Sequence, residues 1–463
     1  MTTAEPSSAS SSSASGGGQS LSLAAVLGYA APQFALAALY FPVFALLAPF
    51  YDQTLGLPLA ALGGVLVAVR LLDAVTDPLM GAVSDATRSR FGRRKIWLLV
   101  ATPFVCLSVW MAFVPPPDAG ILYFAVWIAA LSLAWTVAIT PYLAWGGEIA
   151  QDYAGRARVT GWREAMTVLG TLAAVTLFAS AGDDAAQGMR RVALMVLICL
   201  PIGAALAMVL APSPRARGQA AAPVSLSAWR KAVAEVRANA AFRSFMGAHI
   251  ANSAANGLPP VLFFYFVQDV LGAGADAFGV AFTLYLAAAL LGAPVWTALA
   301  TRGAKHRVRG WAMLYAMGVF AFAPLLGEGD ETAFFVISVL TGFAYGADLA
   351  LPPAIQADVV DADTASTGVD RCGVYFALLS VVLKGASGLA GGAALILLGL
   401  AGFEAGAENA PGALLTVSLL YAAAPILLKG VAVALIWNFP IDAAKQAELR
   451  RVIDAAKQDQ AEA

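Results

Sequence analysis

Two aspartates, Asp73 and Asp77, stand four residues apart within an otherwise apolar stretch. On a helix this spacing places both carboxylates on one face, about one turn apart. Two charges that close cannot both stay ionised in a dry interior unless a cation or a proton joins them. Thr76 adds a hydroxyl oxygen beside the pair, and hard cations prefer oxygen ligands. The pattern predicts a site for a sodium ion or a proton, and no organic cofactor is expected.

Three basic residues also fall in or beside apolar stretches, where ionisable groups are rare and mark function. Arg70 precedes Asp73 by three residues, so it could neutralise that carboxylate and compete for the site. Arg163 and Lys384 are candidates for substrate binding or gating. Three alternatives stay open: an ion network that only joins helices, an interfacial Arg163, and a Lys384 that pairs with an aspartate of the other half.

Other polar and aromatic residues point to function more weakly. Lys429 is interpreted as an interface or packing charge, and His249, Asn252 and Asn256 share one helix side that could simply bond two helices. The run 263–266 is interpreted as facing lipid or the membrane interface. Aromatic residues of the N-terminal half could stack on a sugar ring or pack in the core: Tyr40, Trp135, Tyr142 and Trp145.

The composition indicates what must position these residues. Of 463 residues, 60% are hydrophobic and 12% are charged, about half the charge of a soluble protein. The mean hydropathy of +0.75 agrees with a surface that faces lipid. A net charge of −1 argues against a nucleic acid partner. The three cysteines show no metal-ligand spacing, and with only two histidines a zinc site is not expected.

About 20 apolar residues cross a bilayer as a helix, and this length predicts twelve spans. They cover 24–50, 58–84, 96–115, 120–147, 164–182, 191–212, 241–271, 276–300, 308–327, 332–356, 372–402 and 412–438. Arginine and lysine gather in alternate connections, including 88–95 and 302–309. The positive-inside bias therefore predicts that both termini are cytoplasmic.

The loop 213–240 holds much of the mid-chain charge and divides the chain into two halves. We expect a disordered cytoplasmic tail over 1–23, without a secretory signal. Six-helix bundles are predicted over 24–212 and 241–438, followed by an amphipathic cytoplasmic tail over 439–463. This all-α membrane arrangement resembles the major facilitator architecture, in which two bundles rock about a midplane site.

The residues then carry a closer resemblance, to the glycoside–pentoside–hexuronide:cation symporter family, whose best-known member is the melibiose permease. The similarity runs in order from about 24 to 438. It rests on RLLDAVTDPLMG at 70–81, SDATRSRFGRRK at 84–95, PYLAWGGE at 141–148, GWR at 161–163, ADVVDAD at 357–363 and VLKG at 382–385.

The resemblance implies roles for these positions. Asp73, Asp77, Thr76 and Thr136 would form the cation site, with Na⁺ at the two aspartates if coupling uses sodium. Arg163 and Lys384 would line a sugar cavity near the midplane. A gating role falls to Arg70 and to the basic loop 88–95, which would contact acidic groups at the cytoplasmic side. Those gating residues are Asp85, Arg93, Arg94, Glu148 and Asp358.

Two positions depart from the melibiose-type pattern, because Gln33 and Ile139 stand where aspartates hold sugar hydroxyls. Gln33 can still bond a hydroxyl, whereas Ile139 cannot. A site that lacks both carboxylates yet keeps Arg163 and Lys384 is more positive, so an anionic substrate such as a hexuronide is favoured. The remaining substrate candidates are Tyr40 and Tyr142.

The function expected is cation-coupled symport of a sugar or glycoside across a plasma membrane, the inner membrane in a bacterium. One alternative keeps the fold and changes the cargo to a lysolipid or another amphiphile, and Ile139 leaves it open. Another alternative is a sensor or scaffold without transport, which would not need intramembrane charges. No nucleophile–base pair or phosphate loop predicts an enzyme.

Overall fold

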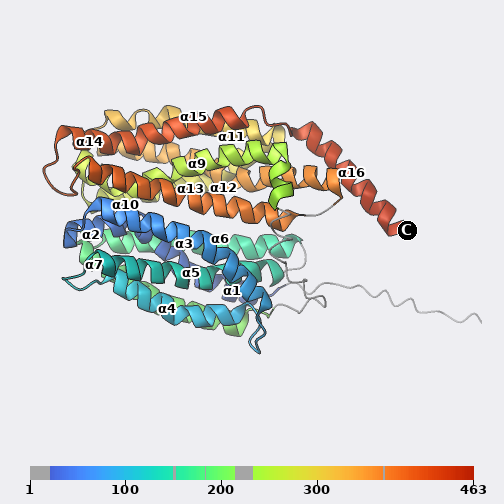
Figure 1. Ribbon diagram of the computed structural model, residues 1–463, viewed down its shortest axis with the longest axis horizontal. Coiled ribbons are helices and arrows are strands. Elements are labelled where there is room, and N and C mark those ends of the chain that lie inside the picture. Colours follow the sequence, from blue (N-terminus) through green and yellow to red (C-terminus); the bar gives the residue numbers. More distant parts are fainter. Residues whose placement is uncertain (1–20, 150–152, 183, 214–232, 369–370, 463) are drawn as a thin grey trace, which may run out of the picture.

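The computed structural model describes residues 21–149, 153–182, 184–213, 233–368 and 371–462. Within these ranges the regular structure is helical, with no strand. Figure 1 shows two layers of long, roughly parallel helices, one from each half of the chain. Residues 1–20 of the expected tail and 214–232 of the expected central loop lie outside the described ranges.

The N-terminal bundle consists of six helical spans. They are α1 (Leu23–Phe41) continued by η1 (Pro42–Leu46) and α2 (Leu47–Leu55), α3 (Leu59–Ala86), α4 (Lys95–Phe113), α5 (Ile121–Ile149), α6 (Tyr153–Ala179) and α7 (Ala185–Leu210). Each predicted span of this half corresponds to one of them. The largest difference is α6, which begins eleven residues before the expected position 164.

The C-terminal bundle repeats this plan. Its spans are α9 (Ala240–Tyr265) with η2 (Phe266–Val270), α10 (Ala275–Arg302), α11 (Lys305–Phe320) with η3 (Ala323–Leu325), α12 (Glu331–Thr367), α13 (Cys372–Leu400), and α14 (Pro411–Ser418) with η4 (Leu419–Ala423) and α15 (Ala424–Ile436). A terminal helix, α16 (Ala443–Glu462), extends away from the bundle. The predicted all-α membrane fold with two six-helix bundles is confirmed.

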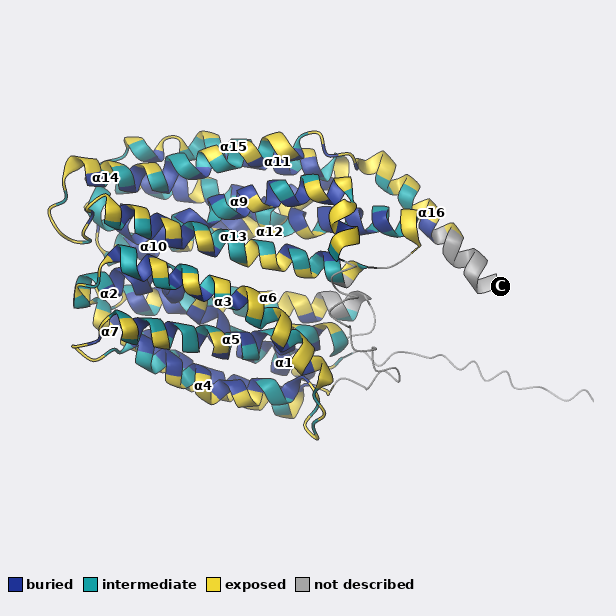
Figure 2. Ribbon diagram, viewed as in Figure 1, coloured by how far each residue is buried: buried dark blue, intermediate teal, exposed yellow. Residues whose placement is uncertain are grey.

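Eleven segments of the described chain are long and apolar enough to cross a membrane. The span that falls short is α6, because charged residues such as Arg163 and Glu164 occupy its first half. Large apolar side chains are exposed on other helices, for example Leu122 at 75% and Val209 at 81%. Figure 2 shows exposed positions along the outer faces of both bundles, as expected where lipid replaces water.

Three spans contain a π-helical turn: η1 after α1, η2 after α9, and η4 before α15. In η1 the turn begins at Pro42, whose ring cannot supply a backbone N–H to the α-helical ladder. The spans that carry η1 and η2 are the first of their respective halves, so the two bundles share this irregularity. Such turns are frequent at functional sites.

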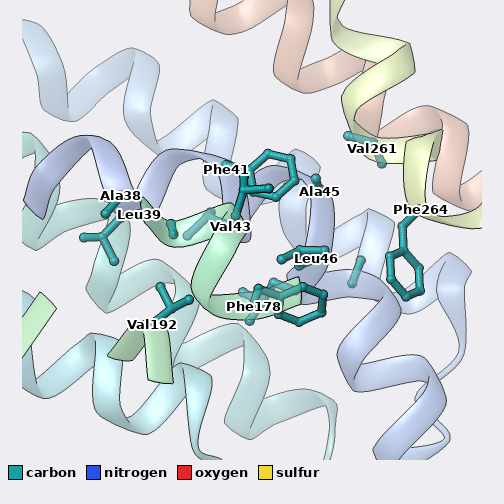
Figure 3. Close-up of a cluster of buried hydrophobic side chains, with 14 of the residues drawn as sticks. Ala38, Leu39, Phe41, Val43, Ala45, Leu46, Phe178, Val192, Val261 and Phe264 are labelled. Carbon is teal, nitrogen blue, oxygen red and sulfur yellow. The ribbon is translucent and has the colours of Figure 1, made fainter. Parts of the chain in front are cut away.

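The hydrophobic core continues across the boundary between the bundles around η1. Figure 3 shows Phe41, Val43 and Leu46 near Phe178 of α6 and near Val261 and Phe264 of α9. All of them are less than a tenth exposed. The run 263–266, expected to face lipid, is likewise buried, with exposed fractions of 0–9%. That expectation is wrong because these aromatic side chains pack against Phe278, Phe334 and Tyr421.

The bundles are joined at the end that carries the loop 401–410. Gln53 Nε2 donates to Gln268 Oε1 at 2.8 Å, and Phe41 packs on Phe282 with ring centroids 4.1 Å apart. The loop contributes too, since the backbone N–H of Ala405 donates to Asp52 at 3.2 Å. Nearer the opposite end, Lys384 and Asp77 form one ion pair between the bundles. Apart from this pair, no hydrogen bond or ion pair between two described residues joins the bundles there.

Candidate cation site and central cavity

Asp73 and Asp77 of α3 face two hydroxyl residues of α5 that have the same spacing. Ser132 Oγ donates to Asp73 Oδ1, and Thr136 Oγ1 donates to Asp77 Oδ1 at 2.8 Å. Because both pairs are four residues apart on their helices, the contacts form two successive rungs between α3 and α5. Asp73 is only 6% exposed and Thr136 only 5%. The site therefore offers four carboxylate oxygens and two hydroxyl oxygens.

Each carboxylate also holds one basic side chain. Arg70 Nη1 lies 2.8 Å from Asp73 Oδ2, and Lys384 Nζ of α13 lies 2.6 Å from Asp77 Oδ2. Two acids and two bases leave this cluster with no net charge. Lys384 joins the opposite bundle to the aspartate pair, which is the alternative that the sequence left open. A cation that binds here would compete with Arg70 or Lys384 for carboxylate oxygens.

Thr76 and Ser132 differ from what the sequence indicated. The Thr76 hydroxyl is buried and makes no hydrogen bond within the described chain, so it is a spare oxygen beside the pair. Ser132 was not expected at the site, although its position four residues before Thr136 mirrors the aspartate spacing. That match of spacing is a signal that the sequence contained.

Small residues bring α3 and α13 together at this site. A Cβ at Gly63 would lie 2.6 Å from the carbonyl oxygen of Gly392, and a Cβ at Gly388 would lie 2.5 Å from Arg70 Cδ. Any larger side chain would push the helices apart or displace Arg70. The glycines thus leave room for Arg70 of α3 and Lys384 of α13 to reach the two aspartates.

A cavity of about 730 Å³ lies between the bundles. Its walls come from α1, η1 and α6 on one side and from α9, α10, α11, α12 and α15 on the other, and they are mostly aromatic and aliphatic. The volume is in the range of pockets that hold small molecules. Among its polar wall residues are Glu164, Asn256, Asp348 and Lys429.

The expected substrate residues are distributed differently around this cavity. Tyr40 lines it and is 53% exposed. Gln33 lies one side chain behind the wall, since its Nε2 donates to Thr167 Oγ1 at 3.0 Å. Arg163 is not part of the wall and pairs with Glu164 at 2.5 Å, while Ile139 is buried in the core.

Tyr142 occupies the core rather than the cavity wall. It is 1% exposed and stacks on Tyr29 with ring centroids 4.7 Å apart. Each of these tyrosines donates its hydroxyl to the backbone carbonyl of the other, at 2.8 and 3.2 Å. In this conformation Tyr142 joins α1 to α5 and does not face the cavity.

The basic loop 88–95 contacts two of the three acidic residues expected for it. Arg93 Nη2 lies 2.6 Å from Glu148 Oε1, and Arg94 bonds Glu148, Asp85 and the Ser84 hydroxyl. The expected contact to Asp358 is absent, because Asp358 pairs with Lys305 of its own bundle at 2.7 Å. Each bundle thus has its own ion-pair cluster at the same end.

A second polar cluster lies in the C-terminal bundle. It joins residues to which the sequence pointed weakly, namely Lys429, His249, Asn252 and Asn256, to Asp348 and Arg309, whose part in it was not expected. Arg309, expected in a loop, is 0% exposed inside α11, and Lys429 lies near Asp348 of α12. Asn252 and Asn256 of α9 donate to Asp348 at 2.9 and 3.0 Å. Asp348 was overlooked, although an acid in the middle of an apolar span was itself a signal.

Phe44 of η1 connects the aspartate pair to the cavity. The Arg70 guanidinium lies 4.4 Å from the centre of the Phe44 ring, which is within cation–π distance. The same ring contacts Tyr40 with a centroid distance of 4.5 Å, and both aromatic residues line the cavity. A displacement of Arg70 from Asp73 would therefore change the contacts of Phe44 in the cavity wall.

The model of the MFS/sugar transport protein family matches residues 28–443, which is most of the chain. The protein belongs to this family. Its curated relatives place it among the glycoside–pentoside–hexuronide:cation symporters, as the sequence motifs indicated. The members of this family of transporters are membrane carriers of small molecules and not enzymes.

Relatives of this MFS transporter are similar over most of their length. The inner membrane symporter YicJ of Escherichia coli is 27% identical over 81% of both chains. The glucuronide carrier protein homolog of the same organism is 24% identical, covering 96% of this chain and 98% of its own. The sodium-dependent lysophosphatidylcholine symporter 1 of Xenopus tropicalis is 23% identical, covering 85% and 82%.

Solved structures share the fold of this MFS transporter at low identity. A mutant of the nucleoside transporter NupG aligns with a TM-score of 0.68 at 15% identity, covering 89% of this chain and 98% of that one. A bacterial homolog of the lysosomal transporter Spinster, in an inward-facing and occupied conformation, aligns with a TM-score of 0.65 at 14% identity, covering 90% and 95%. These likenesses confirm the major facilitator architecture.

Proposed function

We propose that this protein is a cation-coupled symporter that carries a sugar or glycoside-class solute by alternating access. The observation that carries the proposal is the Asp73–Asp77 pair, with each carboxylate bonded to one hydroxyl and one basic side chain. This arrangement can exchange a basic side chain for Na⁺ or H⁺ without leaving a buried carboxylate uncompensated.

Coupling follows from what that exchange does to the neighbours. A cation at Asp73 releases Arg70, which moves relative to Phe44 and so alters the cavity wall beside Tyr40. A cation at Asp77 releases Lys384 and so loosens a contact between the bundles. Because each ligand then favours the same conformation, cation and solute raise the affinity of the carrier for one another.

The basic end of the molecule carries the proposed gate. Arg93 and Arg94 with Asp85 and Glu148 form one ion cluster, and Asp358 with Lys305 forms the other. In our proposal this end faces the cytoplasm, with both chain termini on that side, in a plasma membrane. The contacts at the loop 401–410 would then close the outer side of the carrier.

The glycoside class is supported by the aromatic wall of the cavity. Tyr40, Phe44 and Tyr285 line the cavity, and aromatic side chains of this kind can stack on sugar rings. The name of the glucuronide carrier relative points in the same direction. Gln33 supports the wall through Thr167, and we propose that these two residues contribute hydroxyl recognition.

A lysolipid or another amphiphile is the second candidate cargo. The observation in its favour is the apolar character of most of the cavity wall, which could receive an alkyl chain. Relatives named as lysophosphatidylcholine symporters support it. Competition between an aryl glycoside and a lysolipid for the purified carrier distinguishes the two, because the true cargo stabilises it at the lower concentration.

Gradient-driven uptake into proteoliposomes tests the coupling. The variants Asp73→Asn and Asp77→Asn should each abolish accumulation under an imposed sodium or proton gradient, since neither retains the charge that a cation needs. Exchange of solute without a gradient should persist in at least one variant and shows that the protein is inserted and folded. A variant that still concentrates solute would remove its aspartate from the coupling site.

A further inference from the structure

The polar cluster of the C-terminal bundle draws its members from four helices. Asp348 lies on α12, Arg309 on α11, Lys429 on α15, and His249, Asn252 and Asn256 on α9. Arg309 and Asn252 are almost completely buried, and the side chains of Asp348 and Lys429 are only 9% and 14% exposed. Nothing in the coupling mechanism above uses these residues.

Within the cluster, the side-chain amides of Asn252 and Asn256 make the shortest contacts with the Asp348 carboxylate. Asn252 Nδ2 donates to Asp348 Oδ1 at 2.9 Å, and Asn256 Nδ2 donates to Oδ2 at 3.0 Å. The two basic groups are more distant, with Lys429 Nζ 3.4 Å and Arg309 Nε 3.5 Å from the carboxylate. By comparison, Lys384 lies 2.6 Å from Asp77.

The cluster has an excess of positive charge. It contains one carboxylate and two cationic groups, and no second acid among the described residues bonds to it. A network that only holds helices together needs one cation to match Asp348. The second buried cation is expensive in a membrane interior unless an anion joins it.

The unpaired atoms of the cluster are donors as well. Arg309 Nη1 and His249 Nε2 are buried and have no hydrogen-bond partner within the described chain. Since His249 Nδ1 lies 3.3 Å from Arg309 Nη2, a neutral imidazole accepts there and carries its proton on Nε2. An excess of donors over acceptors complements an anion.

Lys429 and Asp348 connect the positively charged cluster to the solute cavity. Both line its wall together with Asn256, whereas Arg309 is buried behind them. The other cations near the cavity are compensated, because Arg163 pairs with Glu164 and Arg70 pairs with Asp73. The sequence argument for an anionic solute relied on Arg163 and Lys384, and both of these are paired with a carboxylate.

We propose that Lys429, supported by Arg309 behind it, is the anion-recognising end of the solute cavity. The group recognised is a carboxylate or a phosphate attached to an apolar or ring-bearing body, which the aromatic wall receives. Lys429 Nζ would exchange its bonds to Asn252 and Asn256, at 2.9 and 2.7 Å, for bonds to that group. This inference rests on the proposed function and names the charge of its solute.

Binding to the purified carrier tests the inference with two matched pairs of probes. One pair is p-nitrophenyl glucuronide and p-nitrophenyl glucoside, and the other is a lysophosphatidate and the monoacylglycerol with the same acyl chain. In at least one pair the charged probe should bind tighter than its neutral partner. Lys429→Gln should weaken the charged probe by about 10–100-fold, the effect of one charged hydrogen bond, and the neutral probe by about twofold or less.

Two further variants keep the test independent of folding. Lys445→Gln removes a surface lysine that pairs with Glu448 and should change nothing. Asp348→Asn removes the competing carboxylate and should tighten the charged probe while the neutral one stays unchanged. Equal weakening of charged and neutral probes by Lys429→Gln, or weaker binding of the charged probe by Asp348→Asn, would overturn the inference.

The outcomes also separate this inference from the function on which it rests. Suppose that the carrier accumulates the neutral glucoside and that Lys429→Gln changes the affinity for both glycosides by the same factor. The anion site is then refuted and the symporter proposal stands. If only the lysophosphatidate binds in a Lys429-dependent manner, the anion site is supported and the glycoside class is refuted. If none of the four probes binds, both proposals are refuted.

Discussion

At the scale of single residues, charge compensation determines what each buried ionisable group can do. Asp73 and Asp77 are matched by Arg70 and Lys384, so the pair is neutral as a unit. A single opposite charge at close range favours the ionised form of a carboxylate. In our proposal, the basic side chains therefore occupy the places that the coupling cation takes when it binds.

Replacing Lys384 by glutamine should raise the apparent affinity of the carrier for its coupling cation. The change removes the group that competes for Asp77, while Thr136 still holds the other carboxylate oxygen at 2.8 Å. We expect a gain of about tenfold, measured as the sodium or proton concentration that gives half of the cation-induced thermal stabilisation. Lys445→Gln, which removes a surface lysine paired with Glu448, is the control. An unchanged or lower affinity would show that Lys384 does not compete for this site.

Residue-scale prediction from the sequence succeeded where partners were local and failed where they were distant. The grouping of Asp73, Asp77 and Arg70 could be predicted from the sequence because all three lie on one helix. Asp348, Lys429 and Arg309 come from three different helices, so no spacing in the sequence links them. Arg309 also lay one residue inside its predicted span and was grouped with the basic loop before it.

At the scale of helices, close approach between α3 and α13 positions the candidate cation site. Gly63 and Gly392 remove the side chains that would separate the helices, so backbone meets backbone at their crossing. Glycine pairs such as Gly63–Gly64 and Gly391–Gly392 allow close helix approach, but the sequence does not say which helices meet. Pairing of α3 with α13 is a contact between the two halves of the chain, which helix periodicity does not encode.

Gly63→Ala should destabilise the carrier and weaken its cation response. The added Cβ would lie 2.6 Å from a backbone oxygen that cannot move aside independently. Overpacking of this kind costs about 1–3 kcal/mol, visible as a lower thermal midpoint of the purified protein. Gly64→Ala is the adjacent control, since nothing lies within 4 Å of its Cβ position. Equal midpoints for the two variants would argue against a tight crossing.

At the scale of the whole molecule, hydrogen bonds join the two bundles at one end, whereas, apart from the ion pair at the candidate cation site, no hydrogen bond or ion pair between described residues joins them at the other. Gln53 and Gln268, the contacts of Phe41 and the loop 401–410 hold one end closed. The ion clusters at the other end stay within their own bundles. Alternating access by rocking requires the closed end to separate during each cycle.

Tethering the closed end should stop transport. In a background with Cys106, Cys199 and Cys372 replaced by serine, the pair Gln53→Cys and Gln268→Cys would be joined by a short bis-methanethiosulfonate reagent. Gradient-driven uptake should fall to the background level and return when a reductant cleaves the tether. Each single-cysteine variant, treated in the same way, should transport normally. Uptake at the untreated rate by the tethered protein would exclude rocking about this end.

The π-helical turn η1 has a mechanical consequence for this carrier. Such a turn holds one residue more than an α-turn, and we expect that this extra residue can shift along the helix from Pro42–Leu46 without breaking the chain. When the extra residue shifts past a given position, the side chain at that position turns by about 100° around the helix axis. One step past Phe44 would swing its ring away from Arg70 and out of the cavity wall. Rotation of the first span would then open and close the side of the cavity that Phe44 lines.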